Sequence, residues 1–488
     1  MFSSGVLATS SASAANAASS PWAISGMFQT AASSVSAATD KASKGMSEAT
    51  GLSESLCHSA IVGSAAVLSL VSTVVILTEH KRRRYPKQIP GKLGLPWLGS
   101  TPEFFTGCTE WLARSHEQYG DIFKAVIGGE QYVAVRGDEL LQQTMASNKT
   151  DLLENGVLPG ARILFGPQSL LSANHDLHKM LKRIFTKNMG PIPVQDYFPN
   201  VIPVLVERFK TWESTSGNPR YFNAFKVIKE AILHANLTLL LGTGAVPEED
   251  IPLLSYQLHE YSKSILSLPI DVPGTTFHHG IQCANAVKAR IRGLAEGRKG
   301  SKDGSALTLF VNYIDPDTNQ PLPMEIIEQN LLIMLFASQD TTVAAFIKTI
   351  DALASRPDIV RKVREEWGCV DKPMDPEKFV KLTAADFLNK EYTRGVFMEA
   401  VRVQAPITFT IRKTTENLRL TTSKGLDVVL PTGMKILCSL DATMRTHTGV
   451  AGMDRAEFNP DRFTKENRAI MEQNKQYAFC GFGGELNK

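Results

Sequence analysis

The chain has 488 residues, of which 43% are hydrophobic and 21% charged, and its formal net charge at pH 7 is +3. This is ordinary globular composition, and the near-neutral charge gives no reason to expect nucleic acid or an acidic partner. The cysteines are scattered and none forms a C-x-x-C pair, so we expect neither a zinc site nor a disulfide framework and favour a reducing compartment. They are Cys57, Cys108, Cys283, Cys369, Cys438 and Cys480.

The N-terminus departs from this average composition. Residues 1–58 begin with an Ala/Ser-rich stretch that carries almost no charge, and we predict a disordered tail because it cannot bury enough apolar surface. The twenty residues 59–78 carry no charge and match the hydrocarbon thickness of a bilayer, which predicts a transmembrane anchor; the alternative is a buried core helix. The basic cluster at 80–84 then predicts a single span with a cytosolic body, by the positive-inside rule.

The rest of the chain is expected to form a hinge and one catalytic body. Residues 79–105 are basic and rich in proline, which excludes regular helix there and predicts a stiff hinge. In the body, 106–488, a helix ending at Gly120 precedes a hairpin that turns at Gly128 and Gly129. Helical patterns dominate from about 137 to 400, and short strands return near 418, so the fold class is mainly α with minor β sheets.

A long apolar helix pattern over 324–357 contains a polar stretch in its middle, Ser338 to Thr342. Buried polar side chains are costly unless they are bonded or used. One interpretation is an amphipathic helix with Asp340 and Thr341 facing solvent. The other is a helix that passes over a cofactor, where this acid–alcohol pair relays protons to a bound ligand.

A second group of charged residues follows. Glu399 and Arg402, spaced i, i+3, share one helix face and can pair, and Arg462 in a proline-bearing loop could complete a buried charge network. No phosphate loop, H-E-x-x-H pair or G-x-S-x-G turn is present in the sequence. His278 and His279 lie in a predicted loop without a second ligand pair, so we expect no metal site there.

The order of these motifs is more specific than any one of them. A-S-Q-D-T-T, E-x-x-R, N-P-D-R-F and a final F-G-G turn, spaced by about sixty, sixty and twenty residues, closely resemble the cytochrome P-450 superfamily of haem-thiolate monooxygenases over roughly 85–488. The resemblance implies that fold, with an N-terminal transmembrane helix, and haem b and O2 as cofactors. It also implies electrons from NADPH through a flavoprotein reductase or a small haem donor. The anchor fits the microsomal type, hence the endoplasmic reticulum membrane, with a plastid membrane as the lesser alternative.

The resemblance also assigns roles to individual residues. Asp340 and Thr341 would deliver protons on the distal side, while Glu399, Arg402 and Arg462 would form the structural network of the proximal side. The residues that would contact haem are His178, Lys182 and Arg412 at the propionates and Phe482, Gly483 and Gly484 in the proximal turn.

The proximal turn departs from the family pattern. In F-x-x-G-x-R-x-C-x-G the axial cysteine follows Phe482 by seven residues, which is the position after Lys488, so we expect a truncated chain that lacks a metal ligand and is inactive as given. Glu485 and Asn487 stand where the family has glycine and arginine. Cys480 precedes the turn and is not expected to be the ligand.

The substrate is the least specified element. His178 and Lys182, in place of the common Trp/Arg pair, resemble the branch that oxidises sterols, retinoids and related terpenoids, and F-A-S-Q-D-T-T resembles sterol C-22 desaturases. We expect a hydrophobic substrate in an apolar cavity between 153–172 and 331–336; hydroxylation and desaturation stay open. The alternative function is a degenerate, non-catalytic relative that binds lipid or partners. An isomerase or dehydratase of fatty-acid peroxides is disfavoured, because such enzymes tend to lack the acid–alcohol pair.

Overall fold

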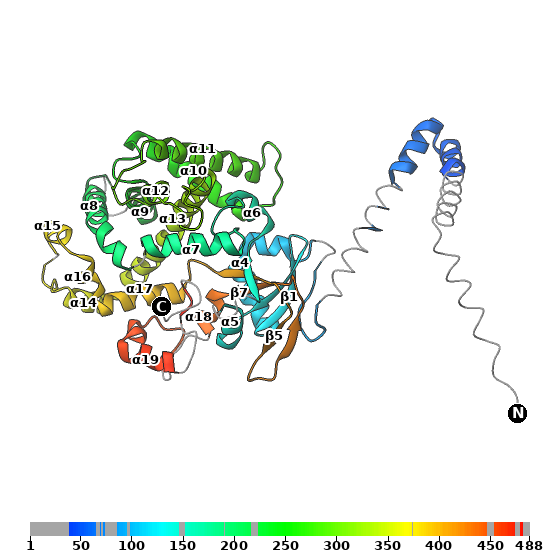
Figure 1. The fold of residues 1–488 in the computed structure, drawn as a ribbon. Coiled ribbons are helices and arrows are strands. Elements are labelled where there is room, and N and C mark those ends of the chain that lie inside the picture. The colour runs from blue at the N-terminus through cyan, green and yellow to red at the C-terminus, as the bar shows by residue number, and fades with distance from the viewer. Residues whose placement is uncertain are drawn as a thin grey trace, which may run out of the picture. The chain divides into compact units, whose positions relative to one another are not determined.

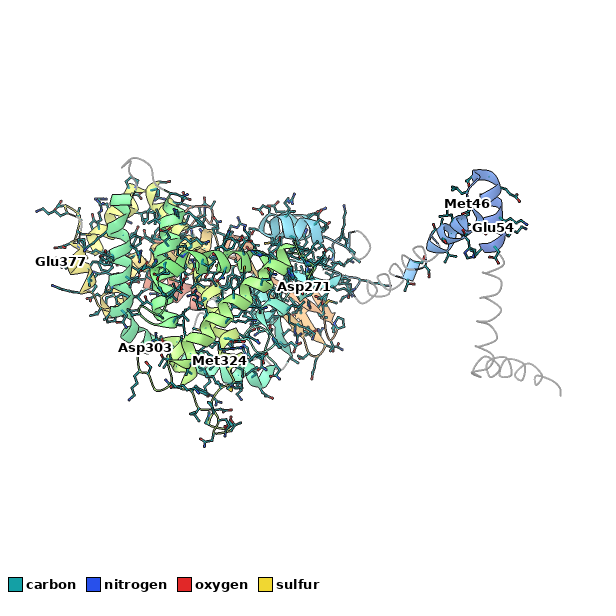
Figure 2. All side chains as sticks on the ribbon, turned by 90° about the horizontal axis from the view of Figure 1, so that it is seen from above. Met46, Glu54, Asp271, Asp303, Met324 and Glu377 are labelled. Carbon is teal, nitrogen blue, oxygen red and sulfur yellow. The ribbon has the colours of Figure 1, made fainter. Side chains whose placement is uncertain are left out.

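A computed structural model describes residues 39–64, 69, 72–73, 85–94, 98–145, 152–189, 191–215, 223–372, 374–446, 453–473 and 479–481. The chain forms two compact units, Met1–Lys81 and Arg82–Lys488, each of which is described by itself. In the first unit residues 39–50 and 54–64 are helical, with Met46 and Glu54 on these helices (Figure 2). The predicted disordered tail is therefore wrong for 39–50 and 54–58, where charged and helix-favouring side chains enter the Ala/Ser-rich sequence. The predicted anchor, 59–78, lies largely outside the described residues.

The second unit is mainly helical, as predicted. Its helices are α4 (Thr101–Tyr119), α5 (Asp138–Met145), α6 (Pro159–Phe165), α7 (His175–Met189), α8 (Pro191–Thr215), α9 (Ala224–Leu241), η2 (Glu248–Asp250), α10 (Ile251–Ile265), α11 (Thr276–Glu296), α12 (Ala306–Val311), α13 (Met324–Ala354), α14 (Pro357–Glu366), α15 (Pro376–Val380), α16 (Ala384–Leu388), α17 (Glu391–Val403), α18 (Leu440–Thr446), η3 (Pro460–Phe463) and α19 (Lys465–Gln473). The strands are β1 (Ile122–Ile127), β2 (Glu130–Val135), β3 (Leu153–Gly156), β4 (Phe409–Thr414), β5 (Leu418–Thr421), β6 (Asp427–Leu430) and β7 (Lys435–Ser439). Helices α9 to α13 gather on one side of this unit and the strands on the other (Figure 1).

Helix α13 is the long helix predicted from the apolar pattern, and it contacts α9, α10, α11, α12, α14 and α17. Its first half, from Ile326 to Leu335, is buried throughout. Among the described residues it is the one helix long and apolar enough to cross a membrane, and half of its most apolar window is buried inside the protein. Its burial against several helices explains that apolar character without a membrane.

The sheets combine local and distant pairings. The five-stranded sheet has the order β1-β2-β7-β4-β3, and β5 pairs with β6. The predicted hairpin is confirmed: β1 and β2 are antiparallel, and Gly128 and Gly129 have φ of 60° and 75°, a left-handed conformation that favours glycine. Strand β2 pairs in parallel with β7, so Tyr132 lies beside Lys435. Strand β3, in the region predicted to be helical, was not predicted.

Two local predictions are wrong. Helix α4 begins at Thr101, inside the predicted hinge, because Pro102 occupies the first turn, where no intrahelical N–H bond is lost. His278 and His279 lie in the first turn of α11 rather than in a loop, after Thr275 caps that helix by accepting the His278 N–H bond.

Candidate functional site

The middle of α13 presents a small accessible strip. Ala337 is exposed, although Leu335 two residues earlier is fully buried, and Thr341 one turn later is half-buried. The Thr341 hydroxyl donates to the Ala337 carbonyl oxygen at 2.6 Å. This bond uses the proton of the hydroxyl within the helix and leaves its oxygen lone pairs free to accept from a second group. The alcohol predicted from the sequence therefore lies on an accessible face.

Asp340 is turned toward another helix. It is half-buried, and its Oδ2 accepts a hydrogen bond of 2.6 Å from the Ser262 hydroxyl of α10. The interpretation in which this carboxylate simply faces solvent does not match this contact between helices. Ser262 was missed by sequence reasoning, because a single serine 78 residues away carries no signal that distinguishes it from its neighbours.

The residues predicted to bind haem propionates lie on two elements that one asparagine joins. His178 Nε2 on α7 lies 3.1 Å from Asn155 Nδ2 on β3, and the Arg412 guanidinium on β4 donates to Asn155 Oδ1. Lys182, one turn after His178 on α7, is exposed. The unpredicted strand β3 positions Asn155 directly opposite Arg412, because these two residues pair in the β3–β4 ladder.

The charged residues predicted to form a network do lie together. Glu399, Arg402 and Arg462 are all fully buried. Glu399 accepts two bonds from Arg402, at 2.7 and 2.9 Å, and Arg462 Nε lies 3.3 and 3.4 Å from its two oxygens. The Asn459 N–H also donates to Glu399, at 2.9 Å. One buried carboxylate thus compensates two buried guanidinium groups.

This network fixes the segment that leads to the proximal turn. Arg462 donates to the Asp454 carbonyl oxygen at 2.8 Å, and the neighbouring Phe463 packs edge-on against Phe479 at 5.4 Å between ring centroids. A Cβ at Gly481 would lie 2.5 Å from Val401 Cγ1, so only glycine fits against α17 there. The predicted turn residues Phe482, Gly483 and Gly484 lie outside the described residues.

Cys480 is a core thiol. It is fully buried, and its Sγ lies 3.7 Å from the Leu440 carbonyl oxygen. Burial raises the pKa of this thiol to about 12, so it is protonated at neutral pH. A metal ligand must be a thiolate, which this environment disfavours. Among the described residues no cluster of three His, Cys, Asp or Glu side chains is placed to hold a metal ion.

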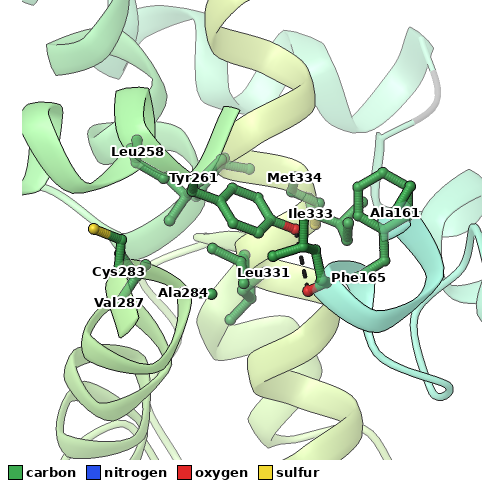
Figure 3. Close-up of a cluster of buried hydrophobic side chains, with 14 of the residues drawn as sticks. Ala161, Phe165, Leu258, Tyr261, Cys283, Ala284, Val287, Leu331, Ile333 and Met334 are labelled. Atoms are coloured by element: carbon green, nitrogen blue, oxygen red, sulfur yellow. Dashed lines mark hydrogen bonds between the residues drawn. The ribbon is translucent and has the colours of Figure 1, made fainter. Parts of the chain in front are cut away.

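The predicted substrate cavity is filled over part of its length. Leu331 to Leu335 belong to the buried core, together with Phe165 of α6. Tyr261 of α10 lies between these elements: its hydroxyl donates to the Leu164 carbonyl oxygen at 3.4 Å, and its ring contacts Phe336 edge-on at 5.6 Å (Figure 3). The prediction is therefore wrong for Leu331 to Leu335, because a tyrosine from a third helix occupies that space.

A planar, dianionic macrocycle such as haem fits the residues present. The exposed Ala337 offers an apolar contact without a bulky side chain in the middle of a core helix. Lys182 and Arg412 are cations of the kind that carboxylates require, Arg412 can pair bidentately, and the His178 ring, which accepts from Asn155 through Nε2, can donate through its other nitrogen. When bound, an iron porphyrin would supply the oxidising chemistry, and the protein would supply its orientation.

The long central helix with an acid–alcohol pair and the buried Glu–Arg–Arg network mark a mainly helical, cofactor-binding enzyme. The cytochrome P450 family model matches residues 89–484, and the chain belongs to this family. It is thus of the class of haem-dependent monooxygenases, which use O2 and externally supplied electrons. The predictions of the family, and of a mainly helical P450 fold, are confirmed.

Several characterised proteins are similar to this chain over most of its length. Cytochrome P450 26B1 of Danio rerio is 24% identical over 405 residues, which cover 81% of this chain and 75% of that protein. Taxane 13-alpha-hydroxylase of Taxus cuspidata is 23% identical, covering 86% and 85%, and abscisic acid 8'-hydroxylase 2 of Arabidopsis thaliana is 23% identical, covering 84% and 80%. The structure of retinoic acid-bound cyanobacterial CYP120A1 matches with a TM-score of 0.69 at 22% identity, covering 82% and 86%, which shows the fold.

Proposed function

We propose that this protein is a monooxygenase that hydroxylates or desaturates a hydrophobic sterol- or terpenoid-like substrate. The observation that carries the proposal is the accessible strip at Ala337 and Thr341, with Asp340 beside it. The relatives support the substrate class. Their names include retinoic acid, taxane and abscisic acid, and these compounds share an isoprenoid carbon skeleton.

We assign each residue a role that its contacts support. The Thr341 hydroxyl donates its hydrogen bond to the Ala337 carbonyl oxygen. Its own oxygen can therefore accept a hydrogen bond from a group on the accessible face. Asp340, on the α10 side of the same turn, takes up a proton from solvent and passes it on. Lys182 and Arg412 would neutralise the propionates of haem and His178 would donate a hydrogen bond to them, so that the three fix its orientation.

The test is conversion of a panel of sterols and isoprenoid acids by the haem-loaded protein, expressed from its complete transcript so that any residues after Lys488 are included, with NADPH, O2 and a flavoprotein reductase. Mass spectrometry distinguishes hydroxylation, the gain of one oxygen, from desaturation, the loss of two hydrogens. Thr341→Ala is expected to lower product formation at least about tenfold. Thr349→Ala is the matched control, since its hydroxyl makes the same kind of bond to Ala345 further along α13.

A lack of haem binding and of turnover would refute the monooxygenase and favour the alternative, a non-catalytic relative that binds lipid. Equal losses in Thr341→Ala and Thr349→Ala would leave no specific role for the alcohol. Loss confined to Thr341→Ala supports the proposal.

We also propose that the protein is anchored in the endoplasmic reticulum membrane, with its body in the cytosol and a flavoprotein reductase or a small haem protein as electron donor. The uncharged run at 59–78 and the basic cluster at 80–84 support this topology. Alkaline extraction and protease digestion of intact microsomes test it: the protein should stay with the membrane and the body should be digested. A protected body would refute the orientation.

A further inference from the structure

We propose that Ser262 is a positioning residue for Asp340, and that α10 thereby links the carboxylate to α6. The inference rests on the proposed function, because it assigns the element that controls the acid of the proton path. Ser262 Oγ donates to Asp340 Oδ2 at 2.6 Å, and in the described part of the chain no other hydrogen bond reaches this carboxylate. The orientation of the acid thus depends on a different helix.

The surroundings of Asp340 are largely polar. The side chains around it are those of Lys229, Ser255, Leu258, His259, Phe336 and Gln339. Lys229 Nζ lies 3.4 Å from His259 Nδ1; the Lys229 side chain is half-buried and that of His259 is exposed. Burial, and secondarily the charge of Lys229, lower the pKa of His259, so its neutral ring can accept from the lysine. The half-buried carboxylate therefore lies among polar side chains rather than in sealed core.

The residue before Ser262 contacts α6. Tyr261 is fully buried, and its hydroxyl donates to the Leu164 carbonyl oxygen of α6 (Figure 3). Its ring also packs on Phe336, which lies one helical turn before Asp340 on the same face of α13. Two successive residues of α10 thus contact α6 and the acid of α13.

These contacts connect α6 to the acid. Phe165, the last residue of α6, packs against Phe336 at 6.1 Å between ring centroids. Because α10 is a continuous helix over Tyr261 and Ser262, the packing of Tyr261 against α6 and Phe336 fixes where Ser262 meets Asp340.

The first test needs no cofactor. Valine and threonine have nearly the same shape but differ by one hydroxyl, so Ser262→Val removes the bond and Ser262→Thr keeps it. In thermal unfolding of the full chain, Ser262→Val is expected to lower the midpoint by about 2 °C relative to Ser262→Thr. In the double variant with Ser262→Val and Asp340→Ala, the decreases of the midpoint should not add, because each substitution removes the same bond. The loss from Ser255→Ala, which also lies beside Asp340 but does not bond it, should add to the loss from Asp340→Ala. Additive losses at Ser262 would overturn the proposal.

The second test reads out positioning in the haem-loaded protein. We expect Ser262→Val to lower the ratio of product formed to NADPH consumed several-fold, and Ser262→Thr to restore it. A wild-type ratio in Ser262→Val would overturn the positioning role, even with a non-additive thermal cycle. A wild-type protein that makes no product would refute the proposed function, and the positioning role with it, while the thermal cycle would still report the Ser262–Asp340 bond.

Discussion

Replacing Glu399 by glutamine should destabilise the protein strongly, because it removes the charge and leaves the shape of the side chain. Glu399, Arg402 and Arg462 are fully buried, so the substitution leaves two guanidinium groups in the core without a counter-charge. Among the residues that the structure describes, Arg402 Nη1 and Arg462 Nη1 already lack hydrogen-bond partners, so this part of the network has no reserve of acceptors. Removing one partner of a buried ion pair costs about 3–5 kcal/mol, and we expect the free energy of unfolding to fall by that amount.

Urea unfolding of the full chain in mild detergent, followed by circular dichroism, measures this loss. The matched control is Asp427→Asn, which makes the same carboxylate-to-amide change in the exposed Arg419–Asp427 pair of the β5–β6 hairpin. The free energy of unfolding of the control should stay close to the wild-type value, and its small decrease should become smaller with added salt. The decrease caused by Glu399→Gln should not depend on salt. A Glu399→Gln protein as stable as the control would refute the argument that this carboxylate compensates both arginines.

Three further predictions concern other parts of the body. Burial raises the pKa of Asp138 to about 6, so the contribution of this carboxyl group to stability is fully present below about pH 3.8 and is lost as pH rises through about 6. Asp138→Asn should therefore raise the free energy of unfolding by about 1 kcal/mol at pH 8 and leave it unchanged at pH 4; an equal gain at both pH values would contradict this. In the native protein, maleimide should label the partly exposed Cys369 far faster than the buried Cys480, whereas in urea the two thiols should react at similar rates. Fast labelling of Cys480 in the native protein would place this thiol outside the core. Asn330→Ala should speed amide exchange of 168–170, because Asn330 bonds the Leu170 N–H and the Gln168 carbonyl; unchanged exchange would mean that other contacts hold this segment.

Patterns within a short stretch of sequence predicted the elements that local chemistry determines. The pattern of apolar residues predicted α13 and its start at Met324, and the Gly128–Gly129 pair predicted the turn of the hairpin. The spacing of Glu399 and Arg402 placed both on one face of α17, where they pair. In each case the partners lie within a few residues of each other, so the sequence itself carries the geometry.

The contacts that tertiary packing creates were not predictable in this way. Ser262 meets Asp340, and Asn155 joins His178 to Arg412, only because α10 and β3 pack where they do. Tyr261 likewise fills space that the resemblance to the family assigned to a substrate. The contact between Arg462 and Glu399, 63 residues apart, was predicted from the charge of the Arg462 loop together with the ordered motifs of the family, and not from local spacing.

The parallel pairing of β2 with β7 has a consequence for synthesis of the chain. Tyr132 and Lys435 are paired although about 300 residues separate them, and His116 bonds Ser439 across a similar interval at 2.8 Å. At about 5–20 residues per second a ribosome needs roughly 15–60 s to make that interval. Until β7 has emerged, β2 has an unpaired edge, of the kind that recruits other chains. The nascent protein is therefore expected to depend on chaperones during that time, and slower elongation would lengthen its exposure to aggregation.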